Sequence, residues 1–284
     1  MDALIDCQTL AEPSPDGVAR VIFDCRSDIA RPAWGAQVYA QGHIPGAYFA
    51  EVNADLSGPR VPGSGRHPLP DTREFARWLG VHGVAPDTLV VAYDQGHGAF
   101  AARLWWLLRA RGHERVRVLD GGFAAWTAAS LPVTAETSAA ANARSVVARP
   151  FAGWLSTTQV RRGLADCALL LVDARGADRY AGQNETIDPV AGHVPGAVSR
   201  PFLDNLDANG RFLSAAQLRA QWQALIDANP GGALATMCGS GITACHHLLA
   251  LEVAGLGDGA RLYAGSFSEW TADPERPVAT GAAG

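Results

Sequence analysis

Three short sequence landmarks occur twice, in the same order, along this chain of 284 residues. The first is an apolar run ending in Asp-x-Arg, found at Val21–Arg26 and again at Leu170–Arg175. The second is Gly-His-Ile/Val-Pro-Gly-Ala, found at Gly42–Ala47 and Gly192–Ala197. An ordered set of landmarks that recurs in one chain predicts two copies of one structural unit.

The third landmark is an apolar run, a glycine-bearing turn, a helical pattern, a second short apolar run and a closing Gly-x-Phe-x-x-Trp. The turn begins at Asp94 in the first copy and at Cys238 in the second. The spacing from these residues to the closing Trp126 and Trp270 is the same in both copies, so this unit aligns without a gap. The copies therefore share a fold but differ at one chemically decisive position.

Each copy alternates apolar strand runs with helical patterns, which predicts an α/β fold with a mainly parallel sheet and helices on both faces. We predict an N-terminal domain over residues 1–133 and a C-terminal domain over residues 156–284. Residues 134–155 form the expected linker, because their first part is rich in Ala, Ser and Thr and has few large apolar side chains. A chain of this length can bury a core in each of two domains.

Composition excludes several classes of function. The net charge is -5 and lysine is absent, which argues against a nucleic-acid surface. No apolar segment reaches the length of a membrane span, and the N-terminus lacks the pattern of a secretory signal. An odd, sparse set of cysteines predicts a reducing compartment, and hence a cytoplasmic location. The five cysteines are Cys7, Cys25, Cys167, Cys238 and Cys245.

The segment Cys238–Thr243 reads Cys-Gly-Ser-Gly-Ile-Thr, between an apparent strand and an apparent helix. Glycines at 239 and 241 let successive backbone N–H groups point inward, and the start of the helix adds a positive dipole end. Such a turn stabilises a thiolate and equally a persulfide, with hydroxyl donors available from Ser240 and Thr243. Ile242 is expected to anchor the turn in the core. The alternative is an inert, buried cysteine.

With these landmarks the chain resembles the tandem rhodanese-type sulfurtransferases over nearly its whole length, and most closely their 3-mercaptopyruvate sulfurtransferase group. That group has the loop Cys-Gly-Ser-Gly-(Val/Ile)-Thr, whereas thiosulfate sulfurtransferases typically have Arg and Lys at positions 239 and 240. The resemblance implies a catalytically inactive N-terminal domain and a catalytic pair, Cys238 and Ser240. It implies substrate binding by the rest of the loop and by an arginine, namely Gly239, Gly241, Ile242, Thr243 and Arg179.

One feature departs from the resemblance. Mercaptopyruvate sulfurtransferases usually have a second arginine several residues after the first, but residues 183–188 here contain none. Asn184 and Thr186 are candidate neutral donors in its place, and thiosulfate stays open as an alternative substrate.

A histidine of the family is proposed to work with the loop serine, which makes His43 a candidate partner of Ser240. His193 occupies the same place in the other copy, so a bend-stabilising role is favoured for both. By the same logic, Arg26 and Arg175 are expected to hold a strand end through a carboxylate pair.

The expected function is transfer of sulfane sulfur from a small-molecule donor to a thiol or cyanide through a Cys238 persulfide. A thioredoxin-like reductant is one candidate acceptor; no metal, organic cofactor, nucleic acid or membrane is expected, and no oligomeric state is indicated. A cysteine phosphatase is disfavoured, because its Cys-x5-Arg loop would require arginine at Ala244. The rival of another class is a non-catalytic sulfur carrier or docking module.

Overall fold

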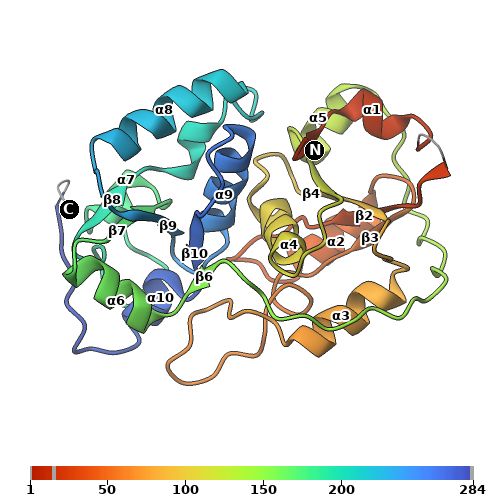
Figure 1. Ribbon diagram of the computed structural model, residues 1–284. Helices are drawn as coiled ribbons and strands as arrows, with labels where there is room; N and C mark the ends of the chain where they lie inside the picture. Colours follow the sequence, from red (N-terminus) through yellow and green to blue (C-terminus); the bar gives the residue numbers. More distant parts are fainter. Residues whose placement is uncertain (1, 15–16, 282–284) are drawn as a thin grey trace. The chain divides into compact units, whose positions relative to one another are not determined.

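The computed structural model describes residues 2–14 and 17–281 (Figure 1). The chain divides into two compact units, and each unit includes a short segment from the other half of the sequence. The first unit consists of Met1–Gly58, Pro70–Ala152 and Ala208–Phe212. The second consists of Pro59–Leu69, Gly153–Asp207 and Leu213–Gly284. The segment Pro59–Leu69 therefore contributes side chains to the unit that contains Cys238.

The first unit has a five-stranded parallel sheet with strand order β1-β5-β4-β2-β3. Its strands are β1 (Leu4–Ile5), β2 (Arg20–Asp24), β3 (Ala47–Phe49), β4 (Leu89–Tyr93) and β5 (Val116–Leu119). Its helices are α1 (Cys7–Ala11), α2 (Trp34–Gln41), α3 (Thr72–Val81), α4 (Ala99–Ala110) and α5 (Gly122–Ala128).

The second unit repeats this arrangement with strand order β6-β10-β9-β7-β8, again all parallel. Its strands are β6 (Trp154–Leu155), β7 (Leu169–Asp173), β8 (Ala197–Ser199), β9 (Ala233–Met237) and β10 (Arg261–Tyr263). Its helices are α6 (Thr157–Ala165), α7 (Ala177–Tyr180), the 3-10 helix η2 (Phe202–Asn205), α8 (Ala215–Asp227), α9 (Thr243–Val253) and α10 (Ser266–Trp270). The predicted α/β fold with two mainly parallel sheets is confirmed.

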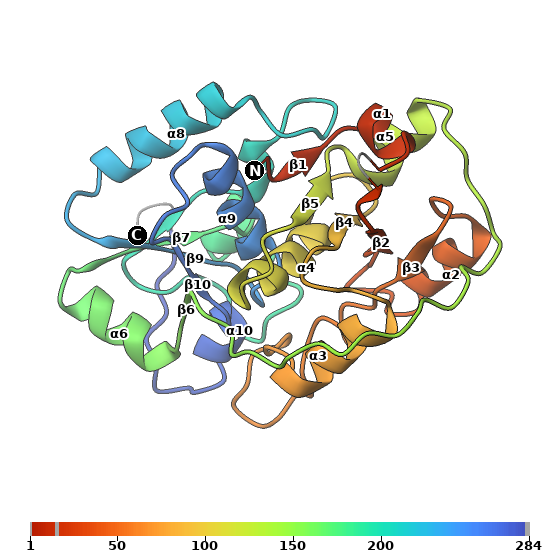
Figure 2. The same ribbon diagram turned by 45° about the vertical axis from the view of Figure 1, so that its right-hand side comes forward.

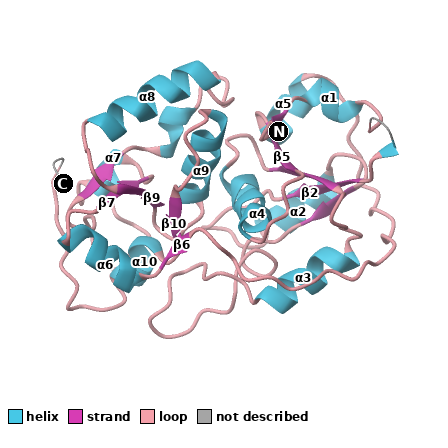
Figure 3. Cartoon of the chain, in the orientation of Figure 1, coloured by secondary structure: helices cyan, strands magenta, loops and turns pink. Residues whose placement is uncertain are grey.

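In the second unit, α8 and α9 cover one face of the sheet, and α6 and α10 cover the other (Figures 1 and 2). The apolar cluster beneath α6 and α10 includes Val160, Met237, Phe267 and Trp270, all buried. Helix and strand alternate through this unit (Figure 3), as the sequence pattern predicts. Burial of both faces explains why β9 and β7 read as nearly continuous apolar runs.

Local sequence signals fix where several helices begin. Ser156 and Ser214 each form a capping box with a glutamine three residues later, Gln159 and Gln217. Asp71 accepts hydrogen bonds from two backbone N–H groups at the start of α3. Among residues 2–14 and 17–281, the helices are too short or too polar to traverse a bilayer.

The duplicated Asp-x-Arg landmark forms a buried ion pair at the end of an interior strand in both units, β2 and β7. The Arg26 guanidinium contacts Asp24 at 2.6 Å, and that of Arg175 contacts Asp173 at 2.7 Å. Each arginine also donates to the carbonyl of the glycine before the duplicated histidine, and each lies 4.0 Å from the centre of a phenylalanine ring. The structural role predicted for Arg26 and Arg175 is confirmed.

Candidate active site

Cys238 directly follows β9, and its side chain lies inside the turn that leads to α9. The residue is only 2% exposed. Its Sγ accepts hydrogen bonds from the backbone N–H groups of Ser240 at 3.4 Å and Gly241 at 3.1 Å. On the opposite side, the carbonyls of Cys238 and Gly239 accept from Phe267 and Ser268 at the start of α10, each at 2.9 Å. Because α10 holds these carbonyls, the loop N–H groups face the sulfur.

Two glycines allow this backbone path. Gly241 has φ +81°, and a Cβ there would lie 2.4 Å from the carbonyl oxygen of Ala264. A Cβ on Gly239 would lie 2.7 Å from Nη2 of Arg66. Ile242 is buried, as an anchor should be, and Thr243 begins α9. The loop is thus closely packed on the α10 side and lined by a guanidinium at Gly239.

The hydroxyl of Ser240 is paired with a histidine that the sequence interpretation missed. Ser240 Oγ lies 2.7 Å from Nδ1 of His67, and both side chains are buried. His67 comes from the segment Pro59–Leu69, which belongs to the second unit. The candidate named from the sequence, His43, belongs to the first unit; its Nδ1 lies 2.9 Å from the carbonyl of Tyr39.

The duplicated histidines have the same local environment. His43 stacks on Tyr39 with ring centroids 3.9 Å apart, and His193 stacks on Tyr180 at 3.8 Å. Each Nδ1 lies within hydrogen-bond distance of the stacked tyrosine's own carbonyl. This arrangement fits the bend-stabilising role that duplication favours.

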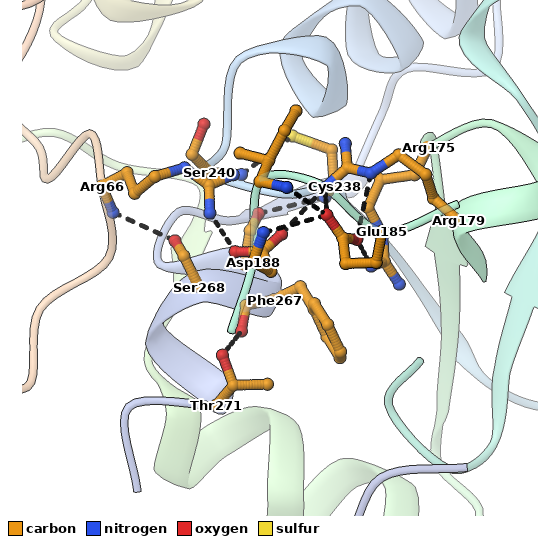
Figure 4. A network of polar contacts seen from close by, with 12 residues as sticks. Arg66, Arg175, Arg179, Glu185, Asp188, Cys238, Ser240, Phe267, Ser268 and Thr271 are labelled. Atoms are coloured by element: carbon orange, nitrogen blue, oxygen red, sulfur yellow. Dashed lines mark hydrogen bonds and ion pairs between the residues drawn. The ribbon is translucent and has the colours of Figure 1, made fainter. Parts of the chain in front are cut away.

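Arg179, at the end of α7, lies beside the cysteine loop in a network of ion pairs (Figure 4). Its Nε and Nη2 each donate to Glu185 at 3.0 Å, and Nη2 also donates to Asp188 at 2.9 Å. The other oxygen of Asp188 accepts from Nη1 of Arg66. Asp188 therefore bridges two guanidinium groups on the side of the loop where Gly239 lies.

Hydrogen bonds and neighbouring charges keep Glu185 and Arg175 of this network ionised despite burial. Burial raises the pKa of Glu185, but donation from the backbone N–H groups of Asp188 and Ile187 and from Arg179 outweighs it, so the pKa is lowered. Burial lowers the pKa of Arg175, but Asp173, Asp188 and Glu185 raise it overall. Arg175 and Glu185 therefore both stay charged at neutral pH.

The neutral donors expected between residues 183 and 188 point elsewhere. Asn184 is exposed, with its amide 3.4 Å from Asp178, and Thr186 is exposed as well. The side chains of this stretch that face the arginines are the carboxylates Glu185 and Asp188. The second arginine at the loop is instead Arg66, more than a hundred residues earlier in the sequence and next to His67.

The equivalent turn of the first unit is filled by its own side chain. Asp94 is fully buried, and its two carboxylate oxygens accept from the N–H groups of Gly96, Gly98 and Phe100 at 2.9–3.0 Å. A further N–H, that of Ala101, lies 3.5 Å away. A ring of inward N–H groups thus holds an anion in this unit too, but the anion is part of the protein.

Replacing Asp94 by alanine is expected to destabilise the first unit by about 3 kcal/mol, because several buried N–H groups lose their acceptor at once. Urea denaturation measures this as a lower midpoint. The exposed Asp87, replaced by alanine, should leave the midpoint nearly unchanged. A loss no larger for Asp94 than for Asp87 would contradict the assigned role.

Comparison with known proteins gives concordant matches. The family model described as "Rhodanese-like domain" matches residues 6–129 and 156–273. A Pseudomonas aeruginosa protein described as "Probable 3-mercaptopyruvate sulfurtransferase" is 49% identical over 266 residues, covering 92% of each chain. The mouse "Thiosulfate sulfurtransferase" is 36% identical over 256 residues, covering 87% of this chain and 84% of its own.

A solved structure agrees with these sequence matches. The structure described as "3-mercaptopyruvate sulfurtransferase from Leishmania major" superposes with a TM-score of 0.76 at 29% identity. It covers 94% of this chain and 77% of that chain. The similarity therefore extends through both units.

Proposed function

This chain belongs to the rhodanese-like family of sulfurtransferases, and on that basis we propose that it moves sulfane sulfur from 3-mercaptopyruvate to a thiol or cyanide through a persulfide on Cys238. The observation that carries the proposal is the environment of the Cys238 sulfur. It accepts hydrogen bonds from two backbone N–H groups, in a loop whose Gly239 lies next to the guanidinium groups of two arginines. N–H donors stabilise a thiolate, and guanidinium groups bind a donor carboxylate.

In the first step, the Cys238 thiolate attacks the sulfur of the donor and forms an S–S bond. The donor's C–S bond breaks, and its electron pair stays on the carbon as the enolate of pyruvate. One proton then converts the enolate to pyruvate. The outer sulfur remains as an anion or thiol of the persulfide, where the N–H groups of the loop can hold it.

In the second step, a thiolate or cyanide attacks the outer sulfur, and the Cys238 thiolate leaves with the electron pair of the S–S bond. A thiol acceptor becomes a persulfide, and cyanide becomes thiocyanate. We propose a thioredoxin-like reductant as one physiological acceptor. We place the enzyme in the cytoplasm, because its five cysteines are all free in the described part of the chain.

Mercaptopyruvate is favoured as the donor because the loop supplies no cationic side chain of its own at positions 239 and 240. Thiosulfate is the second candidate, favoured by the guanidinium of Arg66 beside Gly239. Steady-state kinetics with both donors, in parallel and at one ionic strength, distinguish the two. A kcat/KM that is higher for thiosulfate would overturn the donor assignment but not the sulfur transfer.

We assign to Ser240 and His67 the delivery of the proton that converts the enolate to pyruvate. The 2.7 Å contact between them supports a hydroxyl that is polarised by the imidazole. Ser240→Ala and His67→Ala should each lower kcat about a hundredfold, and the double variant should lose little more, because the two groups act as one unit. Stopped-flow measurement of pyruvate release gives the three rates. Losses that multiply in the double variant would contradict this pairing.

The first unit is proposed to be non-catalytic, because Asp94 occupies the position of the nucleophile and fills the ring of N–H groups. The alternative of another class, a sulfur carrier or docking module without turnover, would use the same Cys238 loop. Turnover of a small-molecule donor on the time scale of seconds would exclude that alternative.

A further inference from the structure

The carboxylate of Asp188 occupies the position between the two arginines that lie at the cysteine loop. One of its oxygens accepts from Arg179 Nη2 at 2.9 Å, and the other accepts from Arg66 Nη1. The Asp188 side chain is fully buried, whereas those of Arg66 and Arg179 are 15% and 20% exposed. The two arginines thus reach solvent on one side and are bridged by a protein carboxylate on the other.

Each guanidinium keeps one terminal nitrogen that Asp188 does not use. Arg179 Nη1 forms no hydrogen bond or ion pair with residues 2–14 or 17–281. Arg66 Nη2 lies against Gly239: a Cβ built on this glycine would be 2.7 Å from that nitrogen. Nε of Arg66 is buried without a hydrogen-bond partner among the described residues. Donor capacity is therefore present beside the loop, although the charge of the arginines is already balanced.

The charge balance of the network is complete. Three guanidinium groups face three carboxylates, so the cluster beside the loop carries no net charge: Arg66, Arg175 and Arg179 against Asp173, Glu185 and Asp188. A monoanionic donor can use the unoccupied N–H groups with little electrostatic gain. A dianion has a larger desolvation penalty on entering the site, and its electrostatic attraction to a neutral cluster offsets little of that penalty.

We propose that Asp188 is an internal counter-ion that sets donor selectivity: it completes the charge balance of the arginine–carboxylate cluster, so that the site accepts monoanionic 2-oxo acids and discriminates against dianions such as thiosulfate. This inference rests on the proposed function and specifies its substrate class. Removing the charge of Asp188 gives the cluster a net charge of +1. A unit charge at roughly 6 Å, in an effective dielectric constant of about 40, changes binding about tenfold for each charge on the ligand.

The test uses the full chain with Cys238→Ser, so that ligands bind without reacting, and compares it with the same chain carrying Asp188→Asn. Calorimetry measures the dissociation constants of thiosulfate, the dianion, and of pyruvate, the monoanion. Asp188→Asn should increase the affinity for thiosulfate about a hundredfold and that for pyruvate about tenfold, and added salt should reduce both increases. Equal factors for the two ligands, or no change in either, would overturn the proposal.

Two further variants guard against a purely structural effect. Asp178→Asn removes one negative charge from α7, the helix that carries Arg179. The Asp178 carboxylate accepts from the Arg179 backbone N–H and the Asn184 amide and pairs with neither guanidinium, so the ratio of the two affinities should stay within about twofold. Arg66→Gln leaves Asp188 paired with Arg179. It should weaken the binding of thiosulfate more than that of pyruvate, which is the opposite of the change expected for Asp188→Asn. A ratio that moves the same way in Arg66→Gln and Asp188→Asn would also overturn the proposal.

With Cys238 present, Asp188→Asn should raise the kcat/KM of thiosulfate relative to that of mercaptopyruvate about tenfold. An unchanged ratio would contradict the counter-ion role. Failure of the proposed function has a different signature, because turnover in the Cys238→Ser background would exclude the persulfide on Cys238 whatever the ligand ratio is.

Discussion

Replacing Cys238 by serine is expected to lower kcat/KM for sulfur transfer by about four orders of magnitude or more, with folding unchanged. A serine hydroxyl is not ionised at neutral pH and forms no persulfide, so the N–H groups of the loop have no sulfur anion to stabilise. Serine is close in size to cysteine, and it can still accept from the N–H groups of Ser240 and Gly241 that now reach Sγ. The expected loss is therefore chemical.

The control for this variant is Cys167→Ser, because Cys167 is exposed and lies in the turn after α6, away from the loop. It should keep the activity of the unaltered protein. Circular dichroism and a urea midpoint show whether either variant is folded. Activity that survives in Cys238→Ser, with the fold intact, would contradict the assignment of the nucleophile.

The second large effect is expected at Arg179. Arg179→Ala should raise the KM for mercaptopyruvate about a hundredfold and change kcat much less, because the guanidinium binds the carboxylate of the donor in both ground state and transition state. Glu185 keeps its backbone N–H donors from Ile187 and Asp188, and Asp188 keeps Arg66, so the carboxylates stay partnered. Stability should therefore change less than substrate affinity.

Arg179→Lys separates the charge from the fork of N–H donors. Lysine retains the positive charge but cannot donate from two nitrogens to Glu185 as Arg179 does, so an intermediate KM is expected. Arg162→Ala, on the exposed face of α6, serves as the control for loss of one positive charge. An unchanged KM in Arg179→Ala would exclude the donor-binding role.

The parts of the molecule that follow periodic patterns were predictable from the sequence. The apolar runs that end at Asp24 and Asp173 form the interior strands β2 and β7, and the alternation of strands and helices corresponds to the parallel sheets. The asymmetry between Asp94 and Cys238 was visible because the two turns align without a gap. In these segments the local signals and the tertiary packing agree.

Arg66 and His67 were missed because their segment carries no such signal. Pro59–Leu69 is rich in Gly and Pro, forms no helix or strand, and lies outside the three landmarks. Its place in the second unit depends on long-range contacts, such as that between the Arg66 backbone N–H and Ser268 Oγ at 3.0 Å. Neither periodicity nor turn chemistry predicts contacts between residues so far apart in sequence.

The carboxylates opposite Arg179 were missed for a different reason. A binding site for an anionic substrate predicts neutral or cationic donors, which favours Asn184 and Thr186 over the carboxylates Glu185 and Asp188. The structure instead orients the acidic side chains inward, where arginines balance their charge. Sequence alone does not reveal which side chains of an irregular loop face a site.

The most direct test of the persulfide mechanism is the intact mass of the protein after reaction with one molar equivalent of 3-mercaptopyruvate in the absence of an acceptor. We expect a protein heavier by one sulfur atom, with fragmentation of the peptide placing the added sulfur on Cys238 and not on Cys245, and we expect cyanide to remove it as thiocyanate. Release of pyruvate without added sulfur on Cys238, or added sulfur on another of the five cysteines, would contradict the account.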